Sequence, residues 1–344
     1  MLKNNKHVLV TGITGFIGSH IAVKLLNAGY SVRGSMRNLD RKDSILKILS
    51  ENSAVSGNLE FVKGELTEPG DWDRAVEGMD YIMHVASPLP FDLKKDANDL
   101  IIPAREGTLN VLKAAVKHKV KRVVLTSSIA AIAHGHKEKV RTYTEEDWTD
   151  LNGEVKDLPP YVQSKTIAES EAWKYINQPE VKTELVAINP GYVFGPLLEK
   201  DYSDSALIVR KLMAGEIPGL PKISFSVVDV RDVAKMHLWA LEEPSAAGNR
   251  FICVNKSSSY QEIAITLKNA FPDFGKKIKT FVLPDFFIRF YSFFNKDTKA
   301  ITIELGRNRT FDNSKAVQMF NWEPRSNKKA ILSLAESLIR FGVV

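Results

Sequence analysis

The sequence predicts an α/β fold: a doubly wound parallel sheet of the Rossmann type, followed by a smaller, mostly helical C-terminal region. Three observations support this prediction. Apolar strand patterns alternate with helical patterns from residue 6 to about residue 190, which is the order expected of right-handed βαβ crossovers. Three glycines spaced three apart directly follow the first strand. After Pro196 the elements become shorter and prolines interrupt them.

In the first region the apolar patterns predict strands over residues 8–10, 30–36, 59–63, 81–85, 122–126 and 184–188. The intervening patterns predict helices over residues 19–28, 40–50, 96–118 and 160–176. Two later apolar stretches are expected to return to the main sheet as strands, 224–228 and 250–254. We therefore expect a dinucleotide-binding domain over residues 1–196 and a smaller substrate-binding domain over residues 197–344.

The turn after the first strand carries glycine at Gly12, Gly15 and Gly18. The first allows a sharp bend, the second lets a pyrophosphate approach the backbone, and the third lets helix and strand pack closely. A helix that begins here directs its free N–H groups at the phosphates. A merely structural turn is the alternative. The position between a strand and a helix favours a dinucleotide site, with three further contacts at Thr11, Phe16 and Ile17.

Arg37 directly follows the second strand, and Arg41 and Lys42 come shortly after it. NAD-dependent proteins usually place an acid here to bind the ribose 2′-hydroxyl, whereas an arginine can bind a 2′-phosphate through two N–H groups. Arg41 or Lys42 can add a second positive charge. Asp40 is the competing acid, but its place before a helix favours an N-cap. The sequence therefore predicts NADPH or NADP⁺ as the cofactor, with NAD as the weaker alternative.

The ends of the third and fourth strands should also face the cofactor, because ligands of such sheets bind beyond the carboxyl ends of the strands. Glu65 could reach the adenine amino group and Leu66 could lie beside the ring, although an ordinary loop explains them as well. His84 could be a catalytic base, but a histidine at a strand end is more often structural. Ribose and phosphates should pass along the three residues that follow it, Val85, Ala86 and Ser87.

The fifth strand ends in Ser127 and Ser128, and the helix over residues 160–176 carries Tyr161 and Lys165. Of the nine tyrosines, only Tyr161 has a lysine four residues later, although a surface pair one helical turn apart is the alternative. An ammonium about 4 Å from a phenol favours phenolate by roughly 4 kcal/mol at an effective dielectric near 20. Tyr161 can then act as acid or base near neutral pH. Successive strand residues point to opposite faces, so only one serine should face the substrate.

Six segments together resemble an extended short-chain dehydrogenase/reductase over nearly the whole chain: residues 11–18, 84–87, 126–128, 161–165, 189–196 and 228–234. Residues 84–88 and 189–196 most resemble the branch that contains dihydroflavonol, cinnamoyl-CoA and methylglyoxal reductases. The resemblance implies these roles: Ser128 as catalytic serine, Tyr161 as acid/base, Lys165 as ribose-binding lysine, Arg37 at the 2′-phosphate, and Pro190 and Val193 along the nicotinamide amide. We also count Ser127 among the cofactor contacts.

These observations predict NADPH-dependent reduction of an aldehyde or ketone to an alcohol. A hydride reaches the carbonyl carbon from nicotinamide, Tyr161 supplies the proton, and a serine hydroxyl holds the oxygen. Two alternatives stay open. An NAD-dependent sugar-nucleotide epimerase or dehydratase uses the same triad but would favour an acid after the second strand. A non-catalytic NADP-sensing regulator would have no need of Tyr161 and Lys165 together.

The residues expected around the carbonyl are apolar or aromatic, as in most small-molecule sites: Phe91, Ile129, Val162, Tyr192 and Phe194. They predict a small to medium, largely apolar aldehyde, ketone or 1,2-dicarbonyl substrate. A diphosphate would require a cluster of cations, and the available ones do not group in the sequence: Lys211, Lys222, Arg231 and Arg250.

Composition excludes several other classes. One cysteine, Cys253, allows no internal disulfide and no cysteine-based zinc site, and His134 with His136 makes too small a set for a metal, so no metal is expected. The net charge of +6 accompanies no nucleic-acid-binding module. No signal peptide or membrane span is evident. We expect a cytoplasmic monomer or homodimer, in which the aromatic stretch 285–294 forms core or pocket wall.

Overall fold

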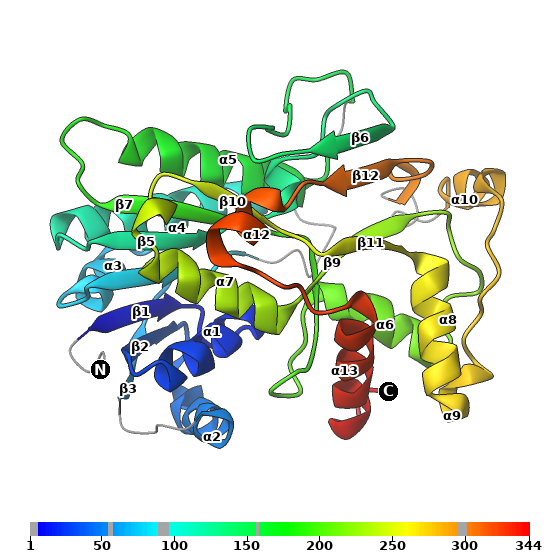
Figure 1. The fold of residues 1–344 in the computed structure, drawn as a ribbon, viewed down its shortest axis with the longest axis horizontal. Coiled ribbons are helices and arrows are strands. Elements are labelled where there is room, and N and C mark those ends of the chain that lie inside the picture. Colours follow the sequence, from blue (N-terminus) through cyan, green and yellow to red (C-terminus); the bar gives the residue numbers. More distant parts are fainter. Residues whose placement is uncertain (1–5, 54–57, 89–95, 156–157, 295–300) are drawn as a thin grey trace.

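The computed structural model describes residues 6–53, 58–88, 96–155, 158–294 and 301–344. Its central sheet has seven parallel strands in the order β10-β7-β5-β4-β1-β2-β3 (Figure 1). Their bounds are β1 (His7–Thr11), β2 (Ser31–Met36), β3 (Leu59–Lys63), β4 (Tyr81–His84), β5 (Arg122–Thr126), β7 (Glu184–Pro190) and β10 (Arg250–Cys253). The chain reverses its direction of travel across the sheet between β1 and β4, which is where such sheets bind their ligand.

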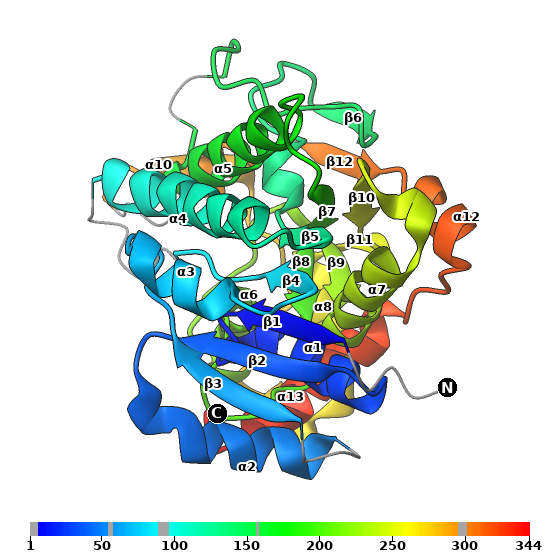
Figure 2. The same ribbon diagram turned by 90° about the vertical axis from the view of Figure 1, so that its left-hand side faces the viewer.

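Helices cover both faces of this sheet, as the prediction of a doubly wound fold requires (Figure 2). One face carries α1 (Phe16–Asn27), α2 (Lys42–Asn52) and α7 (Val230–Glu242), and the other carries α3 (Pro69–Val76), α4 (Asn98–Lys117) and α5 (Pro160–Ile176). The centre of the sheet is buried on both faces, because β1 is buried after its first residue and β5 is buried throughout. The predicted fold class is confirmed.

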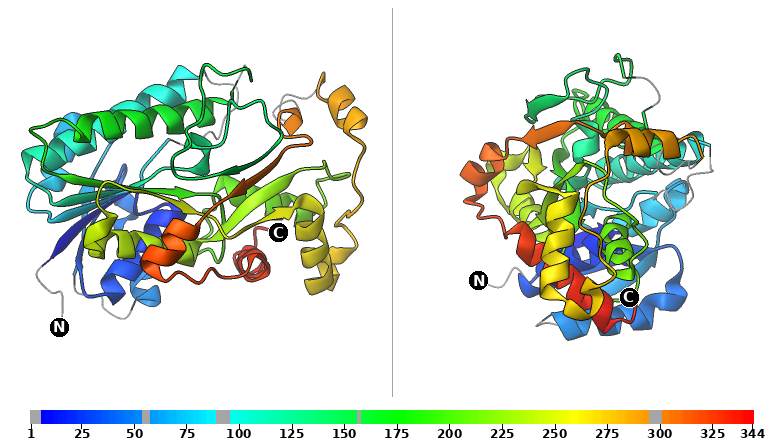
Figure 3. Two further views of the ribbon diagram at one scale, coloured as in Figure 1. Left: turned by 45° about the horizontal axis from the view of Figure 1, so that its top comes forward. Right: turned by 90° about the vertical axis from the view of Figure 1, so that its right-hand side faces the viewer.

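Two smaller sheets, each built from strands of both regions of the chain, and further helices complete the fold. The three-stranded sheet has the order β11-β9-β8, and β12 pairs with β6 in the other. The strands are β6 (Val140–Tyr143), β8 (Tyr192–Phe194), β9 (Ser224–Asp229), β11 (Lys256–Ser259) and β12 (Asn308–Phe311). The helices are α6 (Asp204–Ala214), α8 (Tyr260–Ala270), α9 (Pro272–Gly275), α10 (Asp285–Tyr291), α12 (Ser314–Phe320) and α13 (Asn327–Arg340). Among them α6, α8 and α13 pack together around a second apolar core (Figure 3).

One of the two strands expected to return to the main sheet does so, and the other does not. Residues 250–253 form β10, which pairs in parallel with β7 at the sheet edge. Residues 224–229 form β9, which instead pairs with β8 and β11. Both stretches are mostly apolar, and neither carries a local signal for the strand with which it pairs. The strand β8 follows β7 after a single residue, Gly191, and provides β9 with a partner outside the main sheet.

Two local predictions are corrected. Asp40 does not cap a helix: Asn38 caps a short 3₁₀ turn by accepting from the Asp40 N–H at 2.8 Å, and α2 begins at Lys42. The aromatic stretch is not core, because α10 buries only Ile288 of its seven residues. The other aromatic side chains are exposed: Phe286, Phe287, Phe290, Tyr291, Phe293 and Phe294. None of the described helices is both long enough and apolar enough to cross a bilayer.

Candidate active site

The glycine turn between β1 and α1 has the geometry that a pyrophosphate needs. Gly12 has a φ of +65°, which side chains rarely adopt. Gly15 is the N-cap of α1, where no side chain caps the helix and no acid lies in the first turn. A Cβ on Gly15 would meet only the Gly12 carbonyl, at 3.4 Å, so it would project into otherwise open space. The free N–H groups of Phe16, Ile17 and Gly18 therefore suit an anion.

We expect Gly18→Ala to damage this turn. A Cβ on Gly18 would lie 2.3 Å from the Gly12 carbonyl oxygen, and because that oxygen belongs to the backbone, the turn itself must move. Overpacking of this kind costs roughly 1–3 kcal/mol. Urea unfolding and NADPH titration measure the two effects. Gly70→Ala in α3 is the matched control, since its Cβ would meet only a flexible arginine tip at 3.7 Å. Equal behaviour of the two variants would contradict the prediction.

Thr11 and His84 join the glycine turn to the end of β4. The Thr11 hydroxyl oxygen accepts the N–H groups of Val85 and Ala86, each at 2.9 Å, and lies 3.0 Å from His84 Nδ1. Because this oxygen already accepts two bonds, its proton points to Nδ1, which places the imidazole proton on Nε2. Burial, and after it the charge of Lys165, lowers the pKa of His84 to about 3. The ring is therefore neutral at physiological pH and fits the structural role, not that of a base.

The three cations that follow β2 differ in exposure and in pairing. Arg37 and Lys42 are exposed. Arg41 lies 2.6 Å from Glu199, beyond β8, and 4.0 Å from Asp201. Its charge is thus already matched, and it joins the β2 loop to the second part of the chain. Arg37 and Lys42 are the cations that this loop offers to an incoming phosphate.

The two residues that follow β3, Glu65 and Leu66, make more contacts within the protein than the sequence indicated. Glu65 accepts the N–H of Leu66 at 2.9 Å. The Leu66 side chain packs against Gly107 of α4, where a Cβ would approach it to 2.6 Å, and the Leu66 carbonyl accepts Trp72 Nε1 at 3.2 Å. Both residues are half-buried at the carboxyl end of the sheet. Adenine contacts for them stay a prediction. Ser87 is also half-buried, beyond the end of β4.

The two serines after β5 point to different partners. Ser127 Oγ donates to Glu169 Oε2 at 2.5 Å. Ser128 Oγ accepts the Ala130 N–H at 3.1 Å and so keeps its own proton to donate. Both side chains are more than 90% buried, Ser127 at 6% and Ser128 at 7% exposed. The sequence expectation that one serine faces the substrate now favours Ser128, because Ser127 is held by a carboxylate inside the protein.

Lys165 and Tyr161 lie on consecutive turns of α5 beside the end of β5. Lys165 Nζ donates to the Thr126 carbonyl at 3.3 Å, and the side chain is 8% exposed. Burial lowers the pKa of Lys165 to about 8, and Glu169 acts against that lowering. The ammonium therefore stays mostly protonated at pH 7, as it must to stabilise a tyrosinate. Tyr161 is half-buried at the start of the helix.

Two charged residues of this centre were missed by sequence reasoning. Glu169 is 1% exposed and lies one turn after Lys165, and Arg250 of β10 binds it at 2.6 Å. The signal for Glu169 was its spacing of four from Lys165, which predicts a shared helix face. Nothing in the sequence indicated Arg250, because 81 residues separate it from Glu169.

The predicted nicotinamide and pocket residues divide into two groups. Pro190 ends β7 and Val193 lies in β8, both buried, while Ile129 and Tyr192 are partly exposed near the strand ends. Val162 packs with Ala130 and Leu158, and Phe194 is fully buried in the second core. The structure thus places these last two in packed interior, where their apolar side chains gain most by burial. Phe91 lies outside the described residues.

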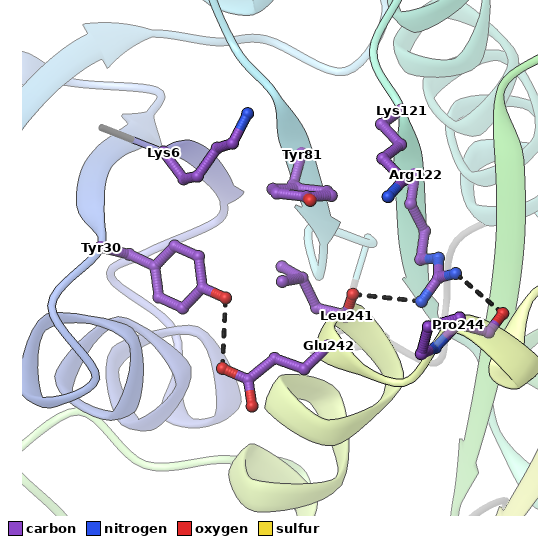
Figure 4. Close-up of a pocket in the computed structure, with 8 residues that line it drawn as sticks. All are labelled: Lys6, Tyr30, Tyr81, Lys121, Arg122, Leu241, Glu242 and Pro244. Carbon is purple, nitrogen blue, oxygen red and sulfur yellow. Dashed lines mark hydrogen bonds between the residues drawn. The ribbon is translucent and has the colours of Figure 1, made fainter. Parts of the chain in front are cut away.

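Two cavities lie away from the strand carboxyl ends. One of about 240 Å³ opens at the amino ends of the central strands and is lined by Lys6, Tyr30, Tyr81, Lys121, Arg122, Leu241, Glu242 and Pro244 (Figure 4). Another of about 210 Å³ lies beside Arg250, Trp148 and Trp173. Neither has the position that cofactor chemistry requires in this fold. Within the described part of the chain, no three His, Cys, Asp or Glu side chains group as metal ligands.

Comparison with known proteins agrees with this geometry. The model of the NAD dependent epimerase/dehydratase family matches residues 8–253. Cinnamoyl-CoA reductase CAD2 of Medicago truncatula is 37% identical over 268 residues, which cover 77% of this chain and 81% of that protein. An anthocyanidin reductase of Vitis vinifera is 32% identical over 282 residues, with coverage of 78% and 82%.

A solved structure extends the likeness to almost the full chain. The yeast methylglyoxal/isovaleraldehyde reductase Gre2, crystallised with NADPH, is 30% identical and has a TM-score of 0.82, with 98% of this chain and 99% of that chain covered. The resemblance stated from the sequence motifs is therefore confirmed. The chain belongs to the NAD dependent epimerase/dehydratase family, within the extended short-chain dehydrogenases/reductases.

Proposed function

We propose that this enzyme reduces small, largely apolar aldehydes, ketones or 1,2-dicarbonyl compounds to alcohols with NADPH. Its class is that of its relatives: it is an NADP-dependent oxidoreductase, and its cofactor is NADPH. One observation supports the carbonyl chemistry most strongly. Tyr161 and Lys165 lie one turn apart on α5, and Lys165 is buried and donates to the carbonyl of Thr126, the last residue of β5, two residues before Ser128.

In the proposed reaction, bound NADPH supplies the hydride that adds to the carbonyl carbon. Tyr161 gives the phenolic proton to the carbonyl oxygen, and the C=O double bond becomes a C–O single bond. Lys165 lowers the energy of the resulting tyrosinate by its positive charge. The Ser128 hydroxyl donates to the substrate oxygen and orients it. We assign cofactor binding to a domain over residues 1–196 and regard residues 197–344 as a smaller substrate-binding domain that adds to the pocket, in a cytoplasmic monomer or homodimer.

The apolar character of the substrate is the part that rests on the pocket side chains. Ile129 and Tyr192 remain available near the strand ends, whereas Val162 and Phe194 contribute by packing behind the site. Arg250, one of the cations that a diphosphate could have used, is committed to Glu169 and to two backbone carbonyls. This commitment weighs against a sugar nucleotide as the substrate.

A substrate panel tests this proposal. We expect NADPH oxidation with branched aldehydes such as isovaleraldehyde, with methylglyoxal or phenylglyoxal, and with aromatic ketones, because the site offers apolar contacts and one acid. Absorbance at the NADPH band measures turnover, and calorimetry measures the binding of UDP-glucose in parallel. Tight UDP-glucose binding without turnover of any carbonyl compound would favour the epimerase alternative. NADPH binding without either would favour the regulator.

A further inference from the structure

Glu169 is a buried carboxylate with donors on every side. Its Oε1 accepts Arg250 Nε at 2.6 Å and Trp173 Nε1 at 3.3 Å. Its Oε2 accepts Ser127 Oγ at 2.5 Å, Asn189 Nδ2 at 2.8 Å and Arg250 Nη2 at 3.4 Å. A carboxylate 1% exposed is tolerated only when such partners replace water.

Two of these donors come from the carboxyl ends of strands that border the proposed catalytic centre. Ser127 directly follows β5, and Asn189 is the next-to-last residue of β7. Asn189 Nδ2 also donates to the Ser128 carbonyl at 3.1 Å. The Glu169 carboxylate, which lies on the same helix as Lys165, therefore holds the backbone of Ser128 through Asn189.

Arg250 holds Glu169 from the other side and is itself fixed. Its Nη1 donates to the carbonyls of Glu145 and Asp147, each at 2.7 Å. Its guanidinium lies 3.8 Å from the centre of the Trp148 ring. The ion pair thus links α5 to the segment after β6 and to β10, the strand that returns from the second part of the chain.

We propose that Glu169 is a positioning residue of the reductase centre. It keeps Ser128 and Lys165 in their positions relative to Tyr161, and Arg250 serves as its fixed counter-ion. The inference rests on the proposed function, because it assigns Glu169 to the same centre. Glu169 contacts neither substrate nor cofactor in this assignment. It acts through Asn189 and through its charge on Lys165.

The effect of Glu169 on the pKa of Lys165 depends on the titratable and charged groups near Lys165. On α5 these are Tyr161 and Glu169, and Glu169 opposes the lowering of the Lys165 pKa by burial. From β4, His84 faces Lys165 as a neutral ring. Arg250 of β10 acts on Glu169, and Arg105 of α4 lies 3.9 Å from Glu171, on the outer side of α5. Removing the negative charge of Glu169 should therefore lower the pKa of Lys165.

The test is the isosteric substitution Glu169→Gln, followed by pH profiles of kcat and kcat/KM with NADPH and a turned-over aldehyde. We expect the alkaline limb, which follows loss of the Lys165 proton, to move down by roughly one pH unit. We also expect kcat to fall by about tenfold or more, because misplaced catalytic groups lose near-attack geometry. Glu169→Asp keeps the charge but shortens the side chain, so the limb should stay in place while kcat falls.

Glu184→Gln is the matched control. Glu184 of β7 binds Arg122 of β5 at 2.7 Å, at the amino ends of these strands and so at the far end from the proposed catalytic centre (Figure 4 shows Arg122). This variant also loses an Arg–Glu pair, and we expect it to leave kcat and the alkaline limb unchanged. If Glu169→Gln does not fold, the double variant Glu169→Gln/Arg250→Gln removes the buried cation together with its partner. We then expect the alkaline limb of the double variant to lie at a lower pH than that of the unmodified enzyme.

The outcomes separate this inference from the proposed function. If the unmodified enzyme turns over and both Glu169→Gln and the double variant keep its limb and kcat, the inference is wrong. If the unmodified enzyme reduces no carbonyl compound, the proposed function is wrong. The pH dependence of NADPH affinity, measured by fluorescence, then decides the inference, because Lys165 is also the predicted ribose contact. A midpoint shifted down in Glu169→Gln supports the inference, and an unshifted midpoint overturns it.

Discussion

Tyr161→Phe should reduce turnover by about 10²- to 10⁴-fold, the usual size of general acid catalysis, while NADPH still binds. Phenylalanine keeps the ring and its packing at the start of α5 and removes only the proton that the carbonyl oxygen requires. Lys165→Met should harm both turnover and NADPH binding, because the ammonium stabilises the tyrosinate and reaches the ribose. Stopped-flow turnover and fluorescence titration of NADPH measure the two quantities separately.

Tyr175→Phe on the same helix is the control for this substitution. Tyr175 is also half-buried, but it lies at the far end of α5 and packs in the core under α4. We expect it to leave turnover unchanged. If Tyr161→Phe kept more than about a hundredth of the rate, the proton would come from another group, since general acid catalysis contributes at least that factor.

Arg37→Asp should weaken NADPH binding by roughly 1.5–3 kcal/mol, the value typical of a lost charge-assisted hydrogen bond, and should improve NADH relative to NADPH. Arg37 is exposed directly after β2, whose last residues pair with the strand that enters the glycine turn. The substitution removes the predicted 2′-phosphate contact and supplies the acid that a free 2′-hydroxyl prefers. Dissociation constants for both cofactors measure the change.

Arg41→Gln is the matched control on the same loop. Its charge is already paired with Glu199 at 2.6 Å, so we expect NADPH affinity to change little and stability to change by no more than about 1 kcal/mol, as for other partly exposed ion pairs. Equal kinetics with NADPH and NADH in the unmodified enzyme would contradict the assignment of Arg37.

Most of the central sheet could be predicted from the sequence because its strands carry short apolar runs bounded by turns. Residues 59–63 and 122–126 agree with β3 and β5, and the helix over residues 160–176 agrees with α5. Helix caps were less predictable, since Asn38 and Asp40 are both good caps and only the local backbone selects Asn38. The pairing of β12 with β6 joins residues 168 positions apart, and no local pattern encodes that contact.

The sequence by itself determined the parts of this enzyme that depend on local spacing. The glycine turn needs residues three apart, and Tyr161 and Lys165 share a helix face because they are four apart. Only the tertiary structure decided which of the two serines a buried carboxylate holds and which cation after β2 pairs with an acid of a distant segment. Those choices depend on Glu169, Arg250 and Glu199, which reach the site from distant segments. A buried charge finds its partner through folding, because its desolvation is compensated only where packing brings an opposite charge to it.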